Sequence, residues 1–236
     1  MEEPIKKTLI IVPAFQEESN IHRVLEDIRL HLPEACILVI NDGSTDRTEQ
    51  IAREAGVKVI NHPYNMGIGA AVQTGFKYAR EHQFSEAVQI DGDYQHPAQE
   101  GPKLLKHLEE EQADLVIGSR FKESTGYHGS WLRRMGNRLF QWVNIAVVGE
   151  KIIDNTSGFR AYSRRAIQLL SQFYLGEYPE PESIRLLKSL GYKIIEVPVW
   201  MRNRSGGKSS ITPMRSIYYM VRVITSIISF NQRHRR

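Results

Sequence analysis

The chain has 236 residues, of which 41% are hydrophobic, 25% charged and 9% aromatic, and its net charge is +4. This composition excludes a disordered, collagenous or coiled-coil protein and is typical of a globular protein with a sizeable core. Because Cys36 is the single cysteine, no internal disulfide can form, and no leader-like segment precedes the first apolar run. We therefore expect a cytoplasmic protein.

Short apolar runs alternate with helical patterns in the first half of the chain. Strands are predicted at 8–12, 36–40, 57–60 and 87–90, because short β-branched runs are typical of buried parallel strands. Helices are predicted at 20–32, 45–55 and 67–80. This alternation predicts an α/β fold with a doubly wound, mostly parallel sheet flanked by helices. Such sheets bind ligands beyond the carboxyl ends of their strands.

The second half of the chain is less regular. The sequence predicts a strand at 115–118, a long apolar helix at 131–148, a helix at 181–190 and a strand at 194–199. No linker, repeat or low-complexity segment marks an earlier boundary, so we expect one domain over residues 1–210.

Residues 211–236 are predicted to form a separate amphipathic, basic helix. From Arg202 to Arg236 there are eight Lys or Arg residues and no Asp or Glu, so the excess positive charge lies at this end. Arg215 and Arg222 make the segment a poor membrane span, which needs about 20 nearly uncharged apolar residues. Such a helix can bind an anionic membrane surface or an integral membrane partner, or pack on its own domain. The acidic body argues against a nucleic-acid partner.

Two carboxylates follow the last of the four N-terminal strands. Asp91 and Asp93 are separated by Gly92, so both carboxylates can turn toward the same ligand, and the glycine permits the close approach of the backbone. Mg²⁺ and Mn²⁺ prefer oxygen ligands and share their coordination shell with phosphates, so Asp93 is the candidate direct ligand, with Asp91 and Gln95 beside it. His96 could add a nitrogen ligand or contact a substrate. A lone Asp-Gly-Asp sequence also shapes turns, but its position after a strand favours a metal site.

Acidic residues also follow the first and second predicted strands. Asp42 could accept hydrogen bonds from a nucleobase or ribose while Asp46 caps the next helix, although a simple turn and cap would use the same residues. After the first strand, a rigid turn at Pro13 places Glu17 at the same edge of the sheet. We therefore expect three acidic loops to converge on one crevice.

These residues belong to segments that recur in a fixed order. They are 12–18 (VPAFQEE), 41–46 (NDGSTD), 65–71 (NMGIGAA) and 91–97 (DGDYQHP), and the pattern continues at 118–121, 154–160 and 202–209. In this order and spacing they resemble the family 2 glycosyltransferases of the GT-A fold over about the first 210 residues. The most similar branch is that of the dolichol-phosphate mannose synthases and polyprenyl-phosphate glycosyltransferases.

The resemblance implies a nucleotide-diphospho-sugar donor, Mg²⁺ or Mn²⁺ as cofactor, and inversion at the anomeric carbon. By similarity, one set of residues would hold the base, ribose and nucleoside, and Asp93 would hold the metal that bridges the two phosphates. That set is Pro13, Ala14, Glu17, Asp42, Asp91 and Gly92.

Basic residues are candidates for contacts with the negatively charged donor phosphates, because a cation and arginines can stabilise the departing diphosphate. The glycine-rich stretch at 205–210 lacks the spacing of a phosphate-binding P-loop and is predicted to be a flap over the donor. The basic candidates are Arg120, Arg134, Arg202, Arg204 and Lys208.

A further acidic pair lies where inverting relatives carry the acid on the acceptor side. A polyprenyl phosphate acceptor is already ionised near neutral pH, but a sugar hydroxyl needs a carboxylate to take its proton. Glu180 or Glu182, on either side of Pro181, could be that catalytic base. Glu182 could equally stabilise the first turn of the helix that follows.

These patterns lead us to expect a metal-dependent, inverting glycosyltransferase at the inner face of a membrane, in cell-surface polysaccharide or glycolipid synthesis. Its acceptor would be lipid-linked, either polyprenyl phosphate or the hydroxyl of a lipid-linked glycan. The alternative is a non-catalytic nucleotide-sugar-binding subunit of a membrane glycosyltransferase complex, against which the intact Asp91 and Asp93 argue. A homo-oligomer is compatible with the sequence.

Overall fold

The computed structural model describes residues 7–120, 152–154, 156–173 and 179–202. The chain divides into two compact units, Met1–Gly126 with Ile153–Ser205, and Tyr127–Ile152 with Gly206–Arg236. The single domain predicted over residues 1–210 stays a prediction. Except for Ile152, every described residue belongs to that first unit. The helix predicted at 131–148 and the segment 211–236 lie outside the described residues.

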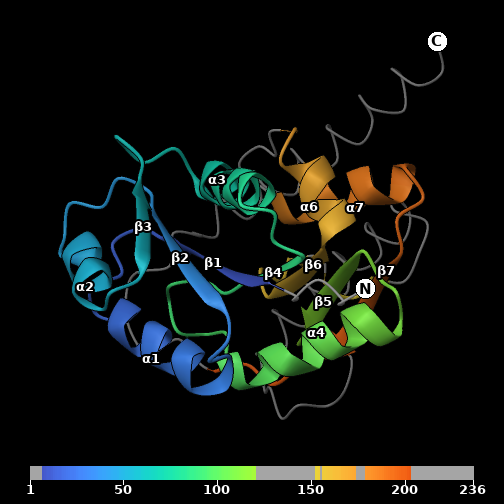
Figure 1. Cartoon of the computed structure of the whole chain (residues 1–236), viewed down its shortest axis with the longest axis horizontal. Coiled ribbons are helices and arrows are strands. Elements are labelled where there is room, and N and C mark those ends of the chain that lie inside the picture. Colours follow the sequence, from blue (N-terminus) through green and yellow to red (C-terminus); the bar gives the residue numbers. More distant parts are fainter. Residues whose placement is uncertain (1–6, 121–151, 155, 174–178, 203–236) are drawn as a thin grey trace, which may run out of the picture. The chain divides into compact units, whose positions relative to one another are not determined.

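A seven-stranded sheet forms the centre of the first unit, with the strand order β3-β2-β1-β4-β6-β5-β7 (Figure 1). β1 pairs in parallel with β2 and β4, β2 with β3, and β5 with β7, whereas β6 is antiparallel to β4 and β5. The predicted mostly parallel sheet is confirmed. The strands are β1 (Thr8–Ala14), β2 (Cys36–Asn41), β3 (Lys58–Asn61), β4 (Glu86–Gln89), β5 (Leu115–Ser119), β6 (Arg160–Ser163) and β7 (Ile194–Pro198).

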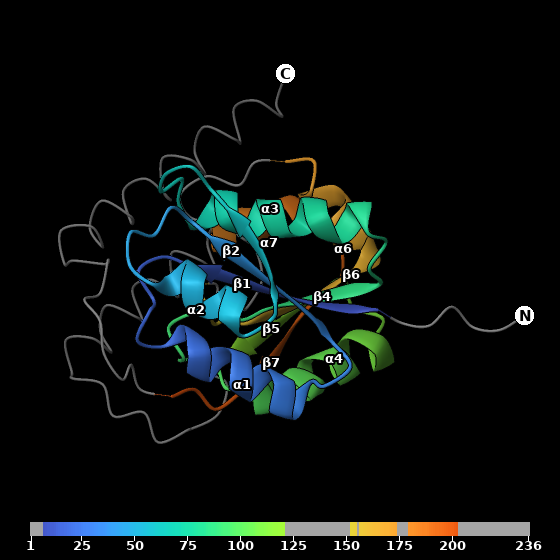
Figure 2. The ribbon, with the colours of Figure 1, turned by 60° about the vertical axis from the view of Figure 1, so that its left-hand side comes forward.

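Helices cover both faces of the sheet. Figure 2 shows α3, α6 and α7 on one face and α1 and α4 on the other, while α2 packs against α1 and β3. The helices are α1 (Ile21–His31), α2 (Thr48–Glu54), α3 (Ile68–Glu81), α4 (Gly101–Glu110), α6 (Arg164–Leu170) and α7 (Pro179–Ser189), with a 3₁₀ turn, η1 (Ala98–Glu100), before α4.

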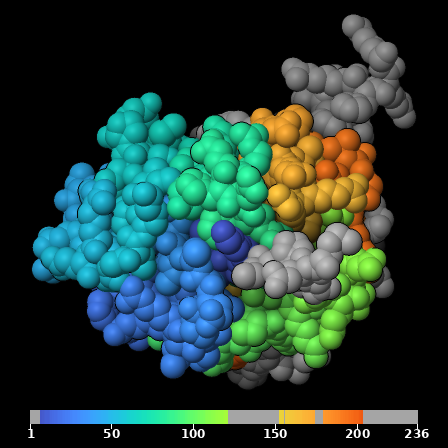
Figure 3. All heavy atoms as spheres, in the orientation of Figure 1, coloured from blue at the N-terminus to red at the C-terminus, as the bar shows by residue number. Residues whose placement is uncertain are grey.

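Burial on both faces explains why the first strands are apolar runs. Ile10, Ile11 and Val12 in β1 are all fully buried, as are the apolar residues at the end of β2. A sheet that is covered on both sides has no solvent-facing side chains to alternate with buried ones. In the space-filling view of Figure 3, the residues of α3 and α6 lie above the sheet and those of α1 and α4 below it.

The structure corrects three details of the predicted elements. α2 begins at Thr48 and not at 45, because the Asp46 carboxylate accepts hydrogen bonds from the Thr48 N–H and hydroxyl, at 3.0 and 2.5 Å, and so closes the preceding loop. α4 and α6 were not predicted. β6 was also missed, because it has only four residues and starts with Arg160, a charged side chain that is nevertheless fully buried.

The path of the chain through the sheet defines where a ligand can bind. From β1 the chain passes to β2 and β3 on one side, and then crosses back to β4 on the other side of β1. The carboxyl ends of β1 and β4 therefore flank a topological switch point, which is the usual ligand site of doubly wound sheets.

Candidate functional site

The loops after β1 and β4 touch at this switch point. The Gly92 N–H donates a hydrogen bond to the Pro13 carbonyl at 3.2 Å. A Cβ atom at Gly92 would lie 3.2 Å from both the Pro13 oxygen and the Ala14 Cβ, and 3.4 Å from the Glu17 Cγ. A larger residue at Gly92 would therefore crowd the loop that carries Glu17, while the predicted contact of Gly92 with a ligand stays a prediction.

The loops after β1 and β2 are joined as well. The Asp42 N–H donates to the Ala14 carbonyl at 2.9 Å, and the Glu17 N–H donates to the Thr48 hydroxyl at 2.8 Å. Together with the Gly92 contact, these bonds connect the three acidic loops that the sequence predicted to converge. The roles of their side chains toward a nucleotide remain predictions.

Other residues of the chain hold Asp91 in place. Its Oδ1 accepts a hydrogen bond from the Gln89 amide at 3.2 Å, and its backbone N–H donates to His96 Nδ1 at 3.1 Å. Gly158 is packed against the carboxylate, since a Cβ atom there would stand only 2.8 Å from Asp91 Oδ2. The glycine in the 154–160 segment is thus explained by the space that Asp91 needs.

His96 has a structural role in this arrangement. Its ring is buried and stacks on Phe159 with 5.2 Å between ring centres. Because His96 Nδ1 accepts the hydrogen bond from the Asp91 N–H, that nitrogen is not available to a metal.

The donor atoms of the 91–95 loop fit a hard divalent cation. Asp93 Oδ1 accepts a hydrogen bond from the Gln95 N–H at 3.0 Å, which places the two residues in one tight turn next to Asp91. Within the described part of the chain, no group of three His, Cys, Asp or Glu side chains could hold a metal by itself. Mg²⁺ is commonly bound by one or two carboxylates together with substrate phosphates, and Asp91, Asp93 and Gln95 provide oxygen donors of that kind.

Asp42 anchors the loop before α3. One carboxylate oxygen accepts from the Met66 N–H at 2.9 Å and is 2.7 Å from His62 Nδ1, and the other accepts from the Gly67 N–H at 2.8 Å. The side chain is almost fully buried. Asp42 therefore holds the 62–67 loop in place, and its predicted contact with a nucleobase stays a prediction.

Two of the predicted phosphate-binding arginines have carboxylate partners. Arg120 forms a two-pronged ion pair with Asp154, with both N–O distances at 2.8 Å. Burial alone would raise the pKa of Asp154, but the hydrogen bonds and charge of Arg120 hold it below its usual value. Arg202 is paired with Asp27 in the same way. The sequence pattern indicated neither partner, and Arg134, Arg204 and Lys208 lie outside the described residues.

Arg160 is a site residue that sequence reasoning missed. It is fully buried, and its guanidinium donates to the Ser157 carbonyl at 2.6 Å and to the Glu180 carbonyl and Ser183 hydroxyl, both at 2.9 Å. It therefore ties β6 to the first turn of α7. The only signal for it in the sequence was a basic residue at the end of the 154–160 segment.

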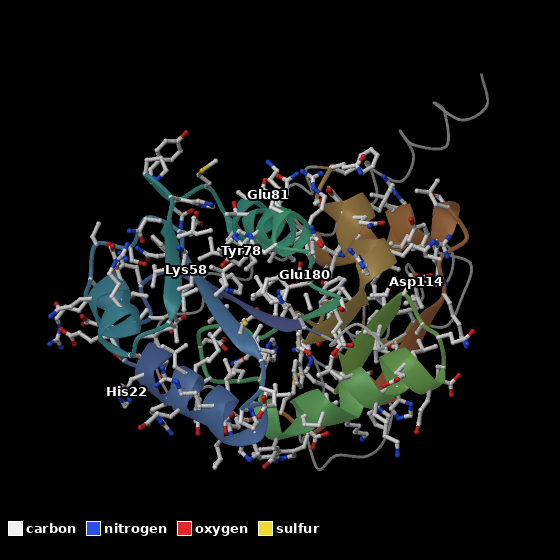
Figure 4. All side chains as sticks on the ribbon, in the orientation of Figure 1. His22, Lys58, Tyr78, Glu81, Asp114 and Glu180 are labelled. Carbon is white, nitrogen blue, oxygen red and sulfur yellow. The ribbon has the colours of Figure 1, made fainter. Side chains whose placement is uncertain are left out.

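Arg160 binds the backbone carbonyl of Glu180 and so holds the first turn of α7 against β6. Glu180 and Glu182 both lie in the first turn of α7, and Glu180 lies between this helix and the sheet (Figure 4). Burial raises the pKa of Glu180 to about 7; the charge of Arg160 opposes the rise, and the negative charges of Asp91 and Glu182 add to it. A carboxyl group with such a pKa can exchange a proton near neutral pH.

Doubly wound sheets bind ligands at such a switch point, so the acidic loops gathered there mark the candidate site. Residues 9–170 match the profile of Glycosyl transferase family 2, and the chain belongs to this family. It is a glycosyltransferase.

Relatives with assigned activities cover most of the chain. The polyprenol monophosphomannose synthase of Mycolicibacterium smegmatis is 28% identical over 219 residues, which are 89% of this chain and 82% of the relative. The UDP-N-acetylglucosamine–dolichyl-phosphate N-acetylglucosaminyltransferase of Methanococcus voltae is 28% identical over 214 residues, 82% of this chain and 85% of the relative. The chain is therefore similar to the branch that the sequence motifs indicated.

A solved structure supports the fold. Glucosyl-3-phosphoglycerate synthase from Mycobacterium tuberculosis, in complex with Mn²⁺, uridine diphosphate and phosphoglyceric acid, superposes with a TM-score of 0.70 at 21% identity. The match covers 95% of this chain and 78% of that one. The predicted GT-A fold is thus confirmed. None of the helices in the described ranges is long and apolar enough to cross a bilayer.

The raised pKa of Glu180 predicts a stability that depends on pH. Because the pKa rises from 4.5 to about 7 on folding, the neutral carboxyl stabilises the fold at low pH, and this stabilisation is lost as the pH rises through 7. A Glu180→Gln variant imitates the neutral form. We expect it to raise the free energy of unfolding at pH 8 by about 2 kcal/mol, and by only a small part of that near pH 4.5.

Urea unfolding of both proteins at the two pH values measures this difference. The Glu182→Gln variant changes the same chemical group in the same helical turn and is the matched control. An equal gain at both pH values, or the same pH profile in the control, would contradict the raised pKa.

Proposed function

We propose that this chain transfers a sugar from a nucleotide-diphospho-sugar to a polyprenyl phosphate, with inversion at the anomeric carbon. The observation that carries the proposal is the contact between the loops after β1 and β4, where the Gly92 N–H bonds to the Pro13 carbonyl. It brings the predicted nucleoside-binding residues and the acidic loop to one edge of the sheet. The activities printed for the relatives support the choice of donor and acceptor.

In the proposed donor site, Pro13, Ala14 and Glu17 bind the nucleoside with Asp91. Asp93, with Asp91 and Gln95, would hold a Mg²⁺ or Mn²⁺ ion, and the ion supplies positive charge that stabilises the departing diphosphate. Complexes of the structural relative with Mn²⁺ or Mg²⁺ and uridine diphosphate support a divalent cation. Gln89 contributes a hydrogen bond to the Asp91 carboxylate, and Gly158 leaves the space that this carboxylate occupies.

A phosphate acceptor fits this chemistry because its oxygen is already negatively charged and needs no base. The family relatives include an undecaprenyl-phosphate mannosyltransferase of Micrococcus luteus, 28% identical over 218 residues. The acceptor phosphate would have to approach the sugar from the side opposite the diphosphate, since inversion requires attack on that face.

The raised pKa of Glu180 favours a second candidate reaction, which is transfer to the hydroxyl of a lipid-linked glycan. A base is most effective when its pKa is close to the working pH, and the pKa of Glu180 is about 7. The two reactions differ in whether they need this carboxylate.

We expect the purified protein, with Mn²⁺ and a labelled nucleotide sugar, to glycosylate a polyprenyl phosphate and not the neutral polyprenol of the same length. Asp93→Asn should lower the rate by about 100-fold or more, because the charge on the diphosphate is then poorly compensated. Glu110→Gln, which neutralises an exposed carboxylate of α4, is the control and should retain activity. Product formation is measured by lipid extraction and chromatography.

Glu180→Gln separates the two acceptors. Transfer to polyprenyl phosphate should persist in this variant. Transfer only to a glycan hydroxyl, together with loss of activity in Glu180→Gln, would favour the second reaction and refute the first.

We also propose that the basic segment 211–236 keeps the enzyme at the inner face of the membrane, near its lipid acceptor. Its charge and amphipathic pattern support binding to anionic lipid. In flotation with vesicles that contain an anionic lipid, the full chain should rise with the vesicles, and a version that ends at Thr212 should not. Equal flotation of both proteins would contradict a membrane-binding role for residues 211–236.

A further inference from the structure

Tyr94 stands between two of the predicted metal ligands and is contacted by two arginines. The guanidinium carbon of Arg23 lies 4.2 Å from the centre of the Tyr94 ring, and that of Arg202 lies 4.0 Å from it. Cation–π attraction favours both contacts. The ring also packs against the hydrophobic core. The side chain of Tyr94 is therefore fixed on several sides.

The backbone of Tyr94 adopts an uncommon conformation. Its φ angle is 65°, in the left-handed region that residues other than glycine rarely adopt. Such a conformation persists when the surrounding structure holds it in place. Because Asp93 and Gln95 are the neighbours of Tyr94 and are bonded to each other at 3.0 Å, the left-handed residue sets the shape of their turn.

Arg202 is itself fixed by two further interactions. Its guanidinium donates two hydrogen bonds to the Asp27 carboxylate, at 2.9 and 3.0 Å, and its backbone N–H donates to the Gln95 carbonyl at 3.0 Å. Asp27 also accepts a hydrogen bond from the Ala98 N–H at 2.8 Å, just beyond the same turn. Arg202 thus reaches the turn both through the Tyr94 ring and through the backbone of Gln95.

The helix α1 provides the base of this arrangement. Arg23 and Asp27 are four residues apart and so lie on one face of the helix, where Arg23 contacts the ring and Asp27 holds Arg202. Residues from α1, from the turn after β4 and from the segment that follows β7 therefore meet at Tyr94. We name Arg23, Asp27, Tyr94 and Arg202 the Tyr94 cluster.

We propose that the Tyr94 cluster positions the 93–95 turn for a divalent cation, and that Arg202 acts through Tyr94 and Gln95 and not as a ligand of the donor phosphates. This inference rests on the proposed function, since it assigns the turn to the cation. The four residues are positioning residues, because the cation would touch Asp93 and Gln95 and none of the cluster side chains. Groups that orient metal ligands typically change metal affinity by roughly 10–100-fold when they are altered.

The chain contains a matched control cluster elsewhere. Arg165 lies over the ring of Tyr192 at 4.0 Å and forms an ion pair with Asp114 at 3.4 Å. This cluster has the same chemistry as the Tyr94 cluster but joins α6 to the segment between α7 and β7. Variants of Arg165 or Tyr192 therefore show what the loss of an arginine–tyrosine contact does to the fold, without a change near the 93–95 turn.

The experiment measures Mn²⁺ binding and not turnover. Full-length protein is titrated with Mn²⁺ in the presence of uridine or guanosine diphosphate, and free Mn²⁺ is followed by electron paramagnetic resonance. Nucleotide binding without Mn²⁺ is measured in parallel. The variants are Tyr94→Gly, which accepts a positive φ without strain but removes the ring, Tyr94→Phe, which keeps the ring, and Arg202→Lys, which keeps the charge but loses the planar guanidinium.

We expect the Mn²⁺ dissociation constant to rise about 10-fold or more in Tyr94→Gly, and in the same direction in Arg202→Lys. Tyr94→Phe and the controls Tyr192→Ala and Arg165→Lys should bind as the wild type does, and metal-free nucleotide binding should be unchanged in all five. Unchanged Mn²⁺ affinity in both Tyr94→Gly and Arg202→Lys would overturn the positioning role, as would an equal loss in the control variants. A wild-type protein that binds no Mn²⁺ with either nucleotide would overturn the proposed function, and this inference with it.

Discussion

The pairing of β1 with β4 is the contact on which the site is built. β4 joins β1 in parallel register, so that the chain leaves both strands at the same edge of the sheet, and the Gly92 N–H then bonds to the Pro13 carbonyl. This pairing brings the Asp-Gly-Asp sequence into contact with the loop that carries Glu17. The parallel pairing requires crossover connections, and the helices in these connections cover both faces of the sheet.

Two arginine–carboxylate ion pairs are a second feature of the structure. The two-pronged pairs Arg120–Asp154 and Arg202–Asp27 connect loops at the edge of the sheet to its helices and strands. Such pairs fix geometry more than they add stability, because removing charges from water offsets much of the Coulomb attraction. Arg120 and Arg202 are thus each bound to a carboxylate of the protein itself.

The sequence predicted the frame of the sheet and the identity of the acidic loops, because both depend on local patterns. The buried runs of β1 and β2 were recognisable from their β-branched residues, and the 91–97 segment from its order relative to the other motifs. The partners of the arginines could not be predicted, since they arise from tertiary contacts: Asp154 is 34 residues from Arg120, and Asp27 is 175 residues from Arg202. β6 was missed because a fully buried arginine gives no strand signal.

The central claim is that the loop after β4 binds a cation together with a nucleoside diphosphate at the switch point. It is tested most directly by anomalous diffraction from a crystal grown with Mn²⁺ and the nucleoside diphosphate that binds. We predict one strong Mn²⁺ peak within direct coordination of an Asp93 carboxylate oxygen, with the nucleoside against the loop after β1. A peak remote from residues 91–95, with the nucleotide bound elsewhere, would contradict the account.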